Sequence, residues 1–174
     1  ERWYKKEHIA KELQQHAVYG LSEFYRKEIE KAKIIACTGC NAAASLFPLL
    51  PLLKRKTIDI SHITISLGAG VSGAGRVAKE NIIHSEVSEG TKPYSVGTHR
   101  HLAELTQEFS KVQSKKIDVT LIPHLLPQNR GIIVSIPLEY KAKAIHKVLD
   151  DYYKNETFII ILPLGDIPAT QHVR

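Results

Sequence analysis

Apolar and polar positions along this chain repeat with the two periods that distinguish strands from helices. Residues 62–67 alternate strictly, with Ile63 and Ile65 on one face, which predicts a strand that buries that face. A second group of apolar residues recurs at helical spacing: Leu102, Leu105, Phe109 and Val112. This spacing places the second group on one side of a helix, and such a side normally faces a protein core.

Similar patterns predict the remaining elements. Helices are expected at 2–15, 22–32, 41–53 and 142–152, and strands at 34–36, 117–122, 132–140 and 158–162. Residues 68–76 are expected to form a glycine-rich loop, and residues 123–131 a turn fixed by two prolines and a glycine. Because Pro137 has no N–H group, the strand at 132–140 should lie at a sheet edge or end early. The order of elements predicts an α+β fold, with a mixed, largely antiparallel sheet covered by helices.

Composition limits the kind of protein that this chain can form. Its 174 residues, 43% hydrophobic and 24% charged, are enough for one domain with a core. No apolar run approaches the roughly 20 residues of a membrane helix. The formal net charge is +6, but acidic residues lie between the basic ones, so a nucleic-acid-binding domain is disfavoured. A small phosphorylated or carboxylated substrate suits such a charge.

The segment around Cys40 is the first candidate for chemistry. A short apolar run ends at Gly39-Cys40, and an alanine-rich helical pattern follows, which places the Cys40 sulfur at a helix N-terminus. Unpaired N–H groups and the helix dipole favour the thiolate there, and the thiolate is the nucleophilic form. Three alternatives remain open: a buried cysteine at a tight turn, a redox dithiol with Cys37, and half of a zinc site without a second cysteine pair. With two cysteines in all, a reducing compartment is expected.

The glycine-rich loop is the second candidate. Residues 68–73 match the GxGxxG pattern of dinucleotide binding, but neither a helix nor a strand with a terminal acid follows at the required distance. A flexible loop whose N–H groups and Ser72 approach an anion, supported by Arg76, explains the composition better. An ordinary glycine-rich connector is the alternative.

Two histidines form the third candidate. His99 and His101 flank Arg100 just before the amphipathic helix, so a possible base lies beside a possible anion clamp. A surface cluster without function is the alternative. In the turn at 123–131, His124 and Arg130 are further candidate ligands.

These motifs together resemble a known family. The segments Val18 to Glu23, Gly39-Cys40, Val71 to Arg76, His99 to His101 and Pro123 to Gly131 occur in the same order as in N-acetyl-gamma-glutamyl-phosphate reductases of arginine biosynthesis. The resemblance covers nearly the whole chain. It implies a fold like the C-terminal domain of glyceraldehyde-3-phosphate dehydrogenase and pairing through the sheet in a homodimer or homotetramer.

The same resemblance implies a reaction and roles for residues. A thiolate at Cys40 would attack an acyl phosphate, and the thioester would accept hydride from NADPH to give a semialdehyde. His99 or His101 would be the acid/base, with a slight preference for His99. Arg100, Ser72 and Arg76 would hold carboxylate or phosphate. No metal is implied, and the enzyme is expected in the cytoplasm.

The resemblance also implies boundaries. Residues 1–174 would form the substrate-binding, catalytic and dimerisation domain, while the Rossmann domain that holds most of the NADP would lie outside this chain. The isolated chain is therefore not expected to complete the reduction.

The chain departs from the family after the nucleophile. The family usually has Pro-Gly-Cys-Tyr-Pro-Thr, whereas this chain has Thr38-Gly39-Cys40-Asn41-Ala42-Ala43. The Gly-Cys-Asn-Ala version is similar to reductases that act on an aminoacyl phosphate held by an acidic carrier protein in lysine biosynthesis. A non-catalytic binding module derived from such an enzyme is the other alternative.

Overall fold

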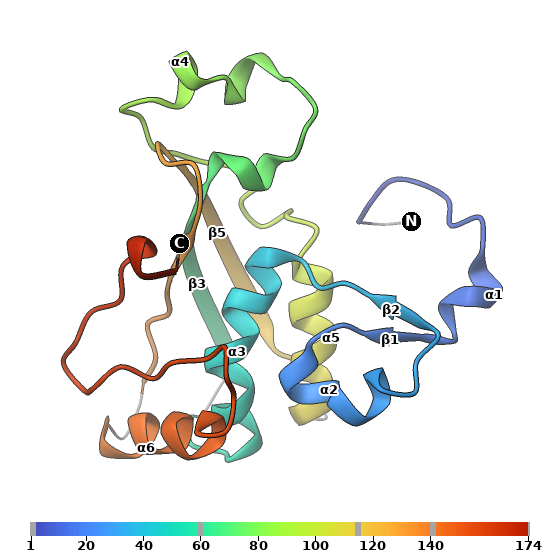
Figure 1. Cartoon of the computed structure of the whole chain (residues 1–174), viewed down its shortest axis with the longest axis vertical. Coiled ribbons are helices and arrows are strands. Elements are labelled where there is room, and N and C mark those ends of the chain that lie inside the picture. Colours follow the sequence, from blue (N-terminus) through green and yellow to red (C-terminus); the bar gives the residue numbers. More distant parts are fainter. Residues whose placement is uncertain (1–2, 59–60, 114–115, 140–141, 174) are drawn as a thin grey trace.

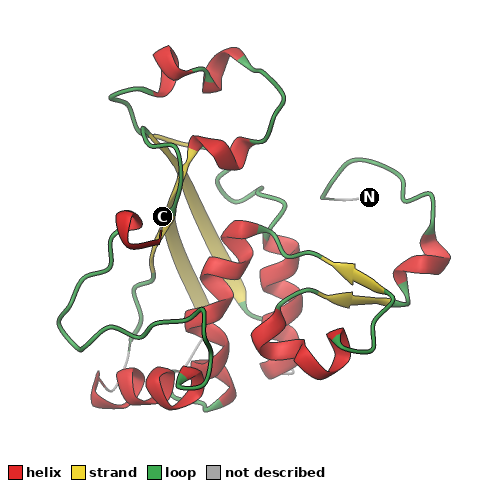
Figure 2. Ribbon diagram, viewed as in Figure 1, coloured by secondary structure: helices red, strands yellow, loops and turns green. Residues whose placement is uncertain are grey.

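The computed structural model describes residues 3–58, 61–113, 116–139 and 142–173. Its helices and strands, with 3₁₀ turns labelled η, are α1 (Lys11–Gln14), β1 (Ala17–Tyr19), α2 (Ser22–Ile29), β2 (Ile34–Ala36), α3 (Cys40–Lys54), β3 (His62–Gly70), η1 (Val71–Ala74), η2 (Glu80–Ile82), α4 (His84–Val87), β4 (Lys92–Pro93), α5 (Leu102–Gln113), β5 (Asp118–Leu126), β6 (Ile132–Ser135), α6 (Ala142–Tyr153) and η3 (Thr170–Val173). Helices and strands are thus interspersed, as Figure 2 shows.

The main sheet has four strands in the order β4-β5-β3-β6. β3 and β5 run parallel over nine residue pairs, with α5 in the connection between them. β6 pairs antiparallel with β3, and β4 pairs antiparallel with β5. The predicted mixed sheet is confirmed, and its longest pairing is the parallel one.

The core lies between this sheet and two helices. α3 and α5 pack against each other and against β3 and β5 (Figure 1). Ile63, Ile65 and Leu67 point from β3 into this core, as the alternation predicted, and Leu105 and Phe109 reach it from α5. The helix α3 is apolar on several sides and most of its residues are buried, while Ala43, Ala44, Phe47 and Pro48 are partly exposed.

A second unit, made of β1, β2 and α2, lies beside α5 (Figure 1). β1 and β2 form a separate parallel pair. Two carboxylates of α5 accept hydrogen bonds from this unit: Glu104 from the hydroxyl of Tyr19, and the fully buried Glu108 from that of Tyr25. Lys111 pairs with Glu108 at 2.7 Å, which offsets the cost of burying that charge. These bonds fix the chain before Cys40 relative to α5.

Two predicted elements are wrong. Of the expected helix at 2–15, only α1 forms, because Trp3 packs against the core and the ring of His8 accepts the N–H of Ala10. No strand forms at 158–162; Phe158 is 92% exposed, and no strand of the described sheet pairs with this segment.

Several boundaries also differ. β5 continues through Pro123 to Leu126, so the turn there is shorter than expected; Pro123 lacks an N–H, and its carbonyl accepts from Tyr94 at 2.9 Å. β6 ends before Pro137, as its missing N–H predicted. Among the described residues, no helix is both long and apolar enough to cross a membrane.

Candidate active site

Cys40 is the first residue of α3. Gly39 before it is extended (φ −71°, ψ 140°), so the chain turns sharply from β2 into the helix. The following turns are anchored by buried Ala42, Leu46 and Leu49, while Cys40 itself is exposed. The first N–H groups of a helix have no partner within it, and α3 therefore directs its positive end at this sulfur. The Cys40 thiol donates to the Asn41 side-chain oxygen at 3.6 Å.

An imidazole lies directly against the residue that precedes this cysteine. A Cβ atom added to Gly39 would be 2.3 Å from Nε2 of His101 and 2.7 Å from Oε1 of Glu104. Such distances are far below van der Waals contact, so this position requires glycine. The absence of a side chain at Gly39 is what lets His101 and Glu104 approach the N-terminus of α3.

Glu104 lies between His101 and the backbone that precedes Cys40. Its Oε2 accepts the N–H of Gly39 at 2.9 Å and the hydroxyl of Tyr19 at 2.7 Å. Burial, with Glu104 adding to it, raises the pKa of Tyr19, which therefore stays a hydrogen-bond donor at neutral pH. Sequence reasoning missed Glu104. The available signal was its position three residues after His101, about one helical turn along from the residue that precedes α5.

The two histidines are buried and touch each other. His99 is 8% exposed and His101 is 5% exposed, with ring centroids 4.5 Å apart at 73°. Nδ1 of His99 accepts the backbone N–H of His101 at 3.2 Å, so a neutral His99 carries its proton on Nε2. Among the described residues, none forms a hydrogen bond with the buried Nδ1 of His101.

Burial keeps both imidazoles neutral. Burial, the neighbouring His101 and the charge of Arg100 together lower the pKa of His99 to about 4. Burial also lowers the pKa of His101; the carboxylate of Glu104 opposes this effect, and Arg100 adds to it. At neutral pH each ring can therefore accept a proton, and Glu104 would stabilise the charge that His101 gains.

This pair predicts acid sensitivity of the fold. Unfolded His99 binds a proton below its usual pKa of 6.5, whereas folded His99 does so only below about 4. Stability should therefore fall as the pH falls from 6.5 to 4, by up to about 3 kcal/mol from this residue. His99→Gln should flatten that part of the profile when unfolding by urea is measured across this range. An unchanged slope in the variant would show that His99 titrates normally.

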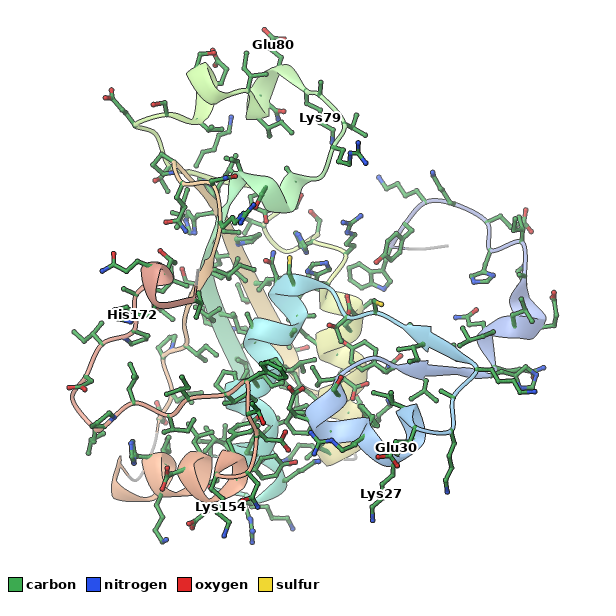
Figure 3. All side chains as sticks on the ribbon, viewed as in Figure 1. Lys27, Glu30, Lys79, Glu80, Lys154 and His172 are labelled. Carbon is green, nitrogen blue, oxygen red and sulfur yellow. The ribbon has the colours of Figure 1, made fainter. Side chains whose placement is uncertain are left out.

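A cleft of about 820 Å³ brings most of the candidate residues together. Cys40, His99, His101, Arg100 and Ser72 all line it. Sequence reasoning missed three other lining residues: Lys79, Lys92 and Tyr94. No aspartate or glutamate is among the described lining residues, so the cleft is cationic. Figure 3 shows Lys79 on the lobe that extends beyond the ends of β3 and β5.

Arg76 is not brought to the cleft, and the glycine loop differs from its expected form. Gly68 to Gly70 belong to β3, and η1 follows. The N–H of Ser72 donates to Asn129 at 3.0 Å, so it is not free for an anion; its side chain remains at the cleft. A Cβ at Gly70 would lie 2.7 Å from the Asn129 carbonyl oxygen, so there is no room for a side chain at this position.

The described residues hold neither a dinucleotide fingerprint nor a metal cluster. The loop that matches GxGxxG leads into a 3₁₀ turn of four residues rather than an α-helix, so it lacks the helix N-terminus that binds pyrophosphate. No group of three or more metal-ligating side chains comes together in the described part of the chain. Both cysteines are free thiols.

Known proteins resemble this chain over all of its length. The family model for the semialdehyde dehydrogenase dimerisation domain matches residues 40–174. An N-acetyl-gamma-glutamyl-phosphate reductase of Cereibacter sphaeroides is 51% identical over 175 residues, which cover 100% of this chain and 51% of the relative. A reductase of the same name from a Jannaschia species is 51% identical over 99% of this chain and 51% of its own length. The chain thus spans about half the length of these curated relatives.

Solved structures confirm the fold class. Aspartate semialdehyde dehydrogenase II of Vibrio cholerae, complexed with ASA, superposes with a TM-score of 0.63 at 17% identity, over 90% of this chain and 54% of that one. An aspartate semialdehyde dehydrogenase of Candida albicans, solved with NADP, gives a TM-score of 0.51 at 17% identity, over 79% of this chain and 45% of that one. The predicted α+β architecture is therefore that of known semialdehyde dehydrogenases.

Proposed function

We propose that this chain, which belongs to the semialdehyde dehydrogenase family through its dimerisation domain, is the catalytic part of an NADP-dependent N-acetyl-gamma-glutamyl-phosphate reductase. The single observation that carries the proposal is that an exposed cysteine at a helix N-terminus lines the same cleft as two buried histidines. The names of the relatives, at 51% identity, supply the substrate.

The first step is acyl transfer to Cys40. The imidazole of His101 takes the thiol proton, and Sγ forms a bond to the acyl carbon of the substrate. The bond between that carbon and the phosphate oxygen breaks, and phosphate leaves with the electron pair. We assign the base to His101 because its Nε2 lies against Gly39 and Glu104 lies beside it to stabilise the imidazolium. This assignment replaces the preference for His99, which instead holds the His101 backbone N–H.

Charge that develops on the acyl oxygen is stabilised by the start of α3. The N–H groups of its first turn have no acceptor within the helix, and the dipole adds to their effect. Arg100, Lys79 and Lys92 hold the phosphate and the α-carboxylate of the substrate, with Ser72 as a neutral donor. Arg76 lies on the same loop as Ser72 but outside the cleft, so it would take part only if that loop moved.

Reduction of the thioester needs a hydride donor that the described residues are not built to hold. When bound, NADPH supplies that hydride. We assign most of its binding to a domain outside this chain, because the glycine loop does not form a dinucleotide fingerprint and the relatives are about twice as long. After that reduction, the bond between the acyl carbon and Sγ of Cys40 breaks, the semialdehyde leaves, and the protonated imidazole of His101 returns its proton to the sulfur, which restores the thiol.

We further propose a homodimer or homotetramer that pairs through the sheet. The face of β3 opposite the core carries Thr64 and Ser66, which are partly exposed, and Ile133 on β6 is 39% exposed. A surface of this mixed character suits an interface between copies. A cytoplasmic location is proposed because both cysteines are free thiols, and a reducing compartment keeps them so.

Phosphate release without NADPH tests this function on the chain itself. N-acetyl-gamma-glutamyl phosphate should release about one phosphate per Cys40, well above its spontaneous hydrolysis. β-Aspartyl phosphate, which lacks the acetyl group and one methylene, should react at least about tenfold more slowly. Equal rates for the two substrates would contradict the proposed specificity, and no release from either would contradict acyl transfer.

A further inference from the structure

The N-terminal segment reaches the candidate active site and contacts Arg100, which lies almost 100 residues away in sequence. Trp3 lines the cleft that contains Cys40, and it packs against the core. Figure 1 shows this segment returning from α1 toward the loop that precedes α5, where Arg100 lies.

Tyr4 makes the next contact. The guanidinium carbon of Arg100 lies 5.4 Å from the centroid of the Tyr4 ring, a distance typical of a cation–π interaction. Tyr4 is itself 59% exposed and Arg100 is also exposed, so this contact lies at the protein surface. Among the described residues, no carboxylate forms an ion pair with Arg100. The ring therefore holds the guanidinium and leaves its N–H groups available for an anion.

Arg100 must be held for a further reason. It lies between His99 and His101, and its charge lowers the pKa of both. A long side chain that moved freely would change both the anion site and the charge felt by the base. A planar ring over one face of the guanidinium restricts it without using any of its donors.

We propose that Trp3 and Tyr4 form a clamp that closes one side of the cleft and positions Arg100 for an anionic group of the substrate. Tyr4 is a positioning residue, and Trp3 is a wall of the cleft. The clamp rests on the proposed function for the identity of the ligand, a carboxylated acyl phosphate. Its existence rests on the contacts of Trp3 and Tyr4 alone.

Trp3 is the chain's one tryptophan, so its fluorescence reports on the clamp without any ligand. Tyr4→Leu and Arg100→Ala should each increase quenching of Trp3 by acrylamide, while Tyr4→Phe, which keeps the ring, should not. Tyr152→Leu is the matched control, because its ring covers Lys54 at 5.7 Å outside the cleft. Unchanged quenching in Tyr4→Leu, or an equal increase in Tyr152→Leu, would overturn the clamp.

Calorimetry with the phosphonate analogue of N-acetyl-gamma-glutamyl phosphate tests the role in binding. Tyr4→Leu should weaken binding about fivefold, and Tyr4→Phe should bind like the wild type. In an Arg100→Ala background, Tyr4→Leu should have no further effect. A full effect in that background would overturn positioning through Arg100. Failure of the wild type to bind the analogue would refute the proposed substrate, whereas the quenching result would still decide whether the clamp exists.

Discussion

Cys40→Ser is expected to lower the rate of phosphate release by at least about 1,000-fold. A hydroxyl is far less acidic and less nucleophilic than a thiol, and the helix N-terminus cannot compensate for that difference. The exchange of sulfur for oxygen at an exposed position should leave the fold unchanged. The rate is measured from single-turnover phosphate release with the acyl phosphate in excess.

The matched control for this variant is Cys37→Ser. Cys37 is also an exposed free thiol, three residues earlier, but it does not line the cleft. Phosphate release should therefore be within about twofold of the wild type. If Cys37→Ser lost activity as Cys40→Ser does, the redox-dithiol interpretation would gain and the single nucleophile would be refuted.

Gly39→Ala is expected to slow acyl transfer about 100-fold. The added Cβ would collide with Nε2 of His101 and Oε1 of Glu104, so at least one of these groups must move. A displacement of about 1 Å in a catalytic group has this order of effect. The loss should appear in the rate of phosphate release rather than in the affinity for the phosphonate analogue, because the anion-binding side chains lie elsewhere in the cleft.

Gly90→Ala is the control for any general effect on activity or stability of replacing a glycine with alanine. A Cβ at Gly90 would approach nothing closer than the Ser88 carbonyl oxygen at 3.9 Å. Activity and melting temperature should therefore stay near those of the wild type. A Gly39→Ala variant with normal phosphate release would mean that His101 is not the base.

The spacing of apolar residues correctly predicted which faces of β3 and α5 are buried. Ile63 and Ile65 alternate with polar residues, and both are fully buried in β3. Leu105 and Phe109 recur at helical spacing and enter the core from α5. In each case one face of an element is apolar, so the pattern itself states which side is buried.

Other features depended on contacts that no local pattern carries. The hydroxyl of Tyr19 meets Glu104 across 85 residues, and Trp3 reaches a cleft built by other elements. At 158–162 the sequence predicted an element that does not form. The apolar run there predicted a strand, but no strand of the described sheet pairs with it. Strands depend on partners, so composition alone does not determine them.

The sequence predicted the parts of the candidate site that follow from local patterns, but not those that depend on contacts between distant segments. Gly39-Cys40 before a helical pattern predicted a cysteine at a helix N-terminus, and the His99-Arg100-His101 triplet predicted two histidines just before a helix. Which histidine lies against Gly39 was not predictable, because it depends on how closely α5 approaches the N-terminus of α3. That approach is possible because Gly39 has no side chain.

Intact-mass measurement after mixing the chain with N-acetyl-gamma-glutamyl phosphate tests the central claim most directly. The account predicts that the protein gains the mass of one N-acetylglutamyl group, that hydroxylamine removes it, and that peptide mapping places it on Cys40. A protein of unchanged mass, with the acyl phosphate consumed no faster than in buffer, would contradict the account, as would an acyl group on Cys37 instead.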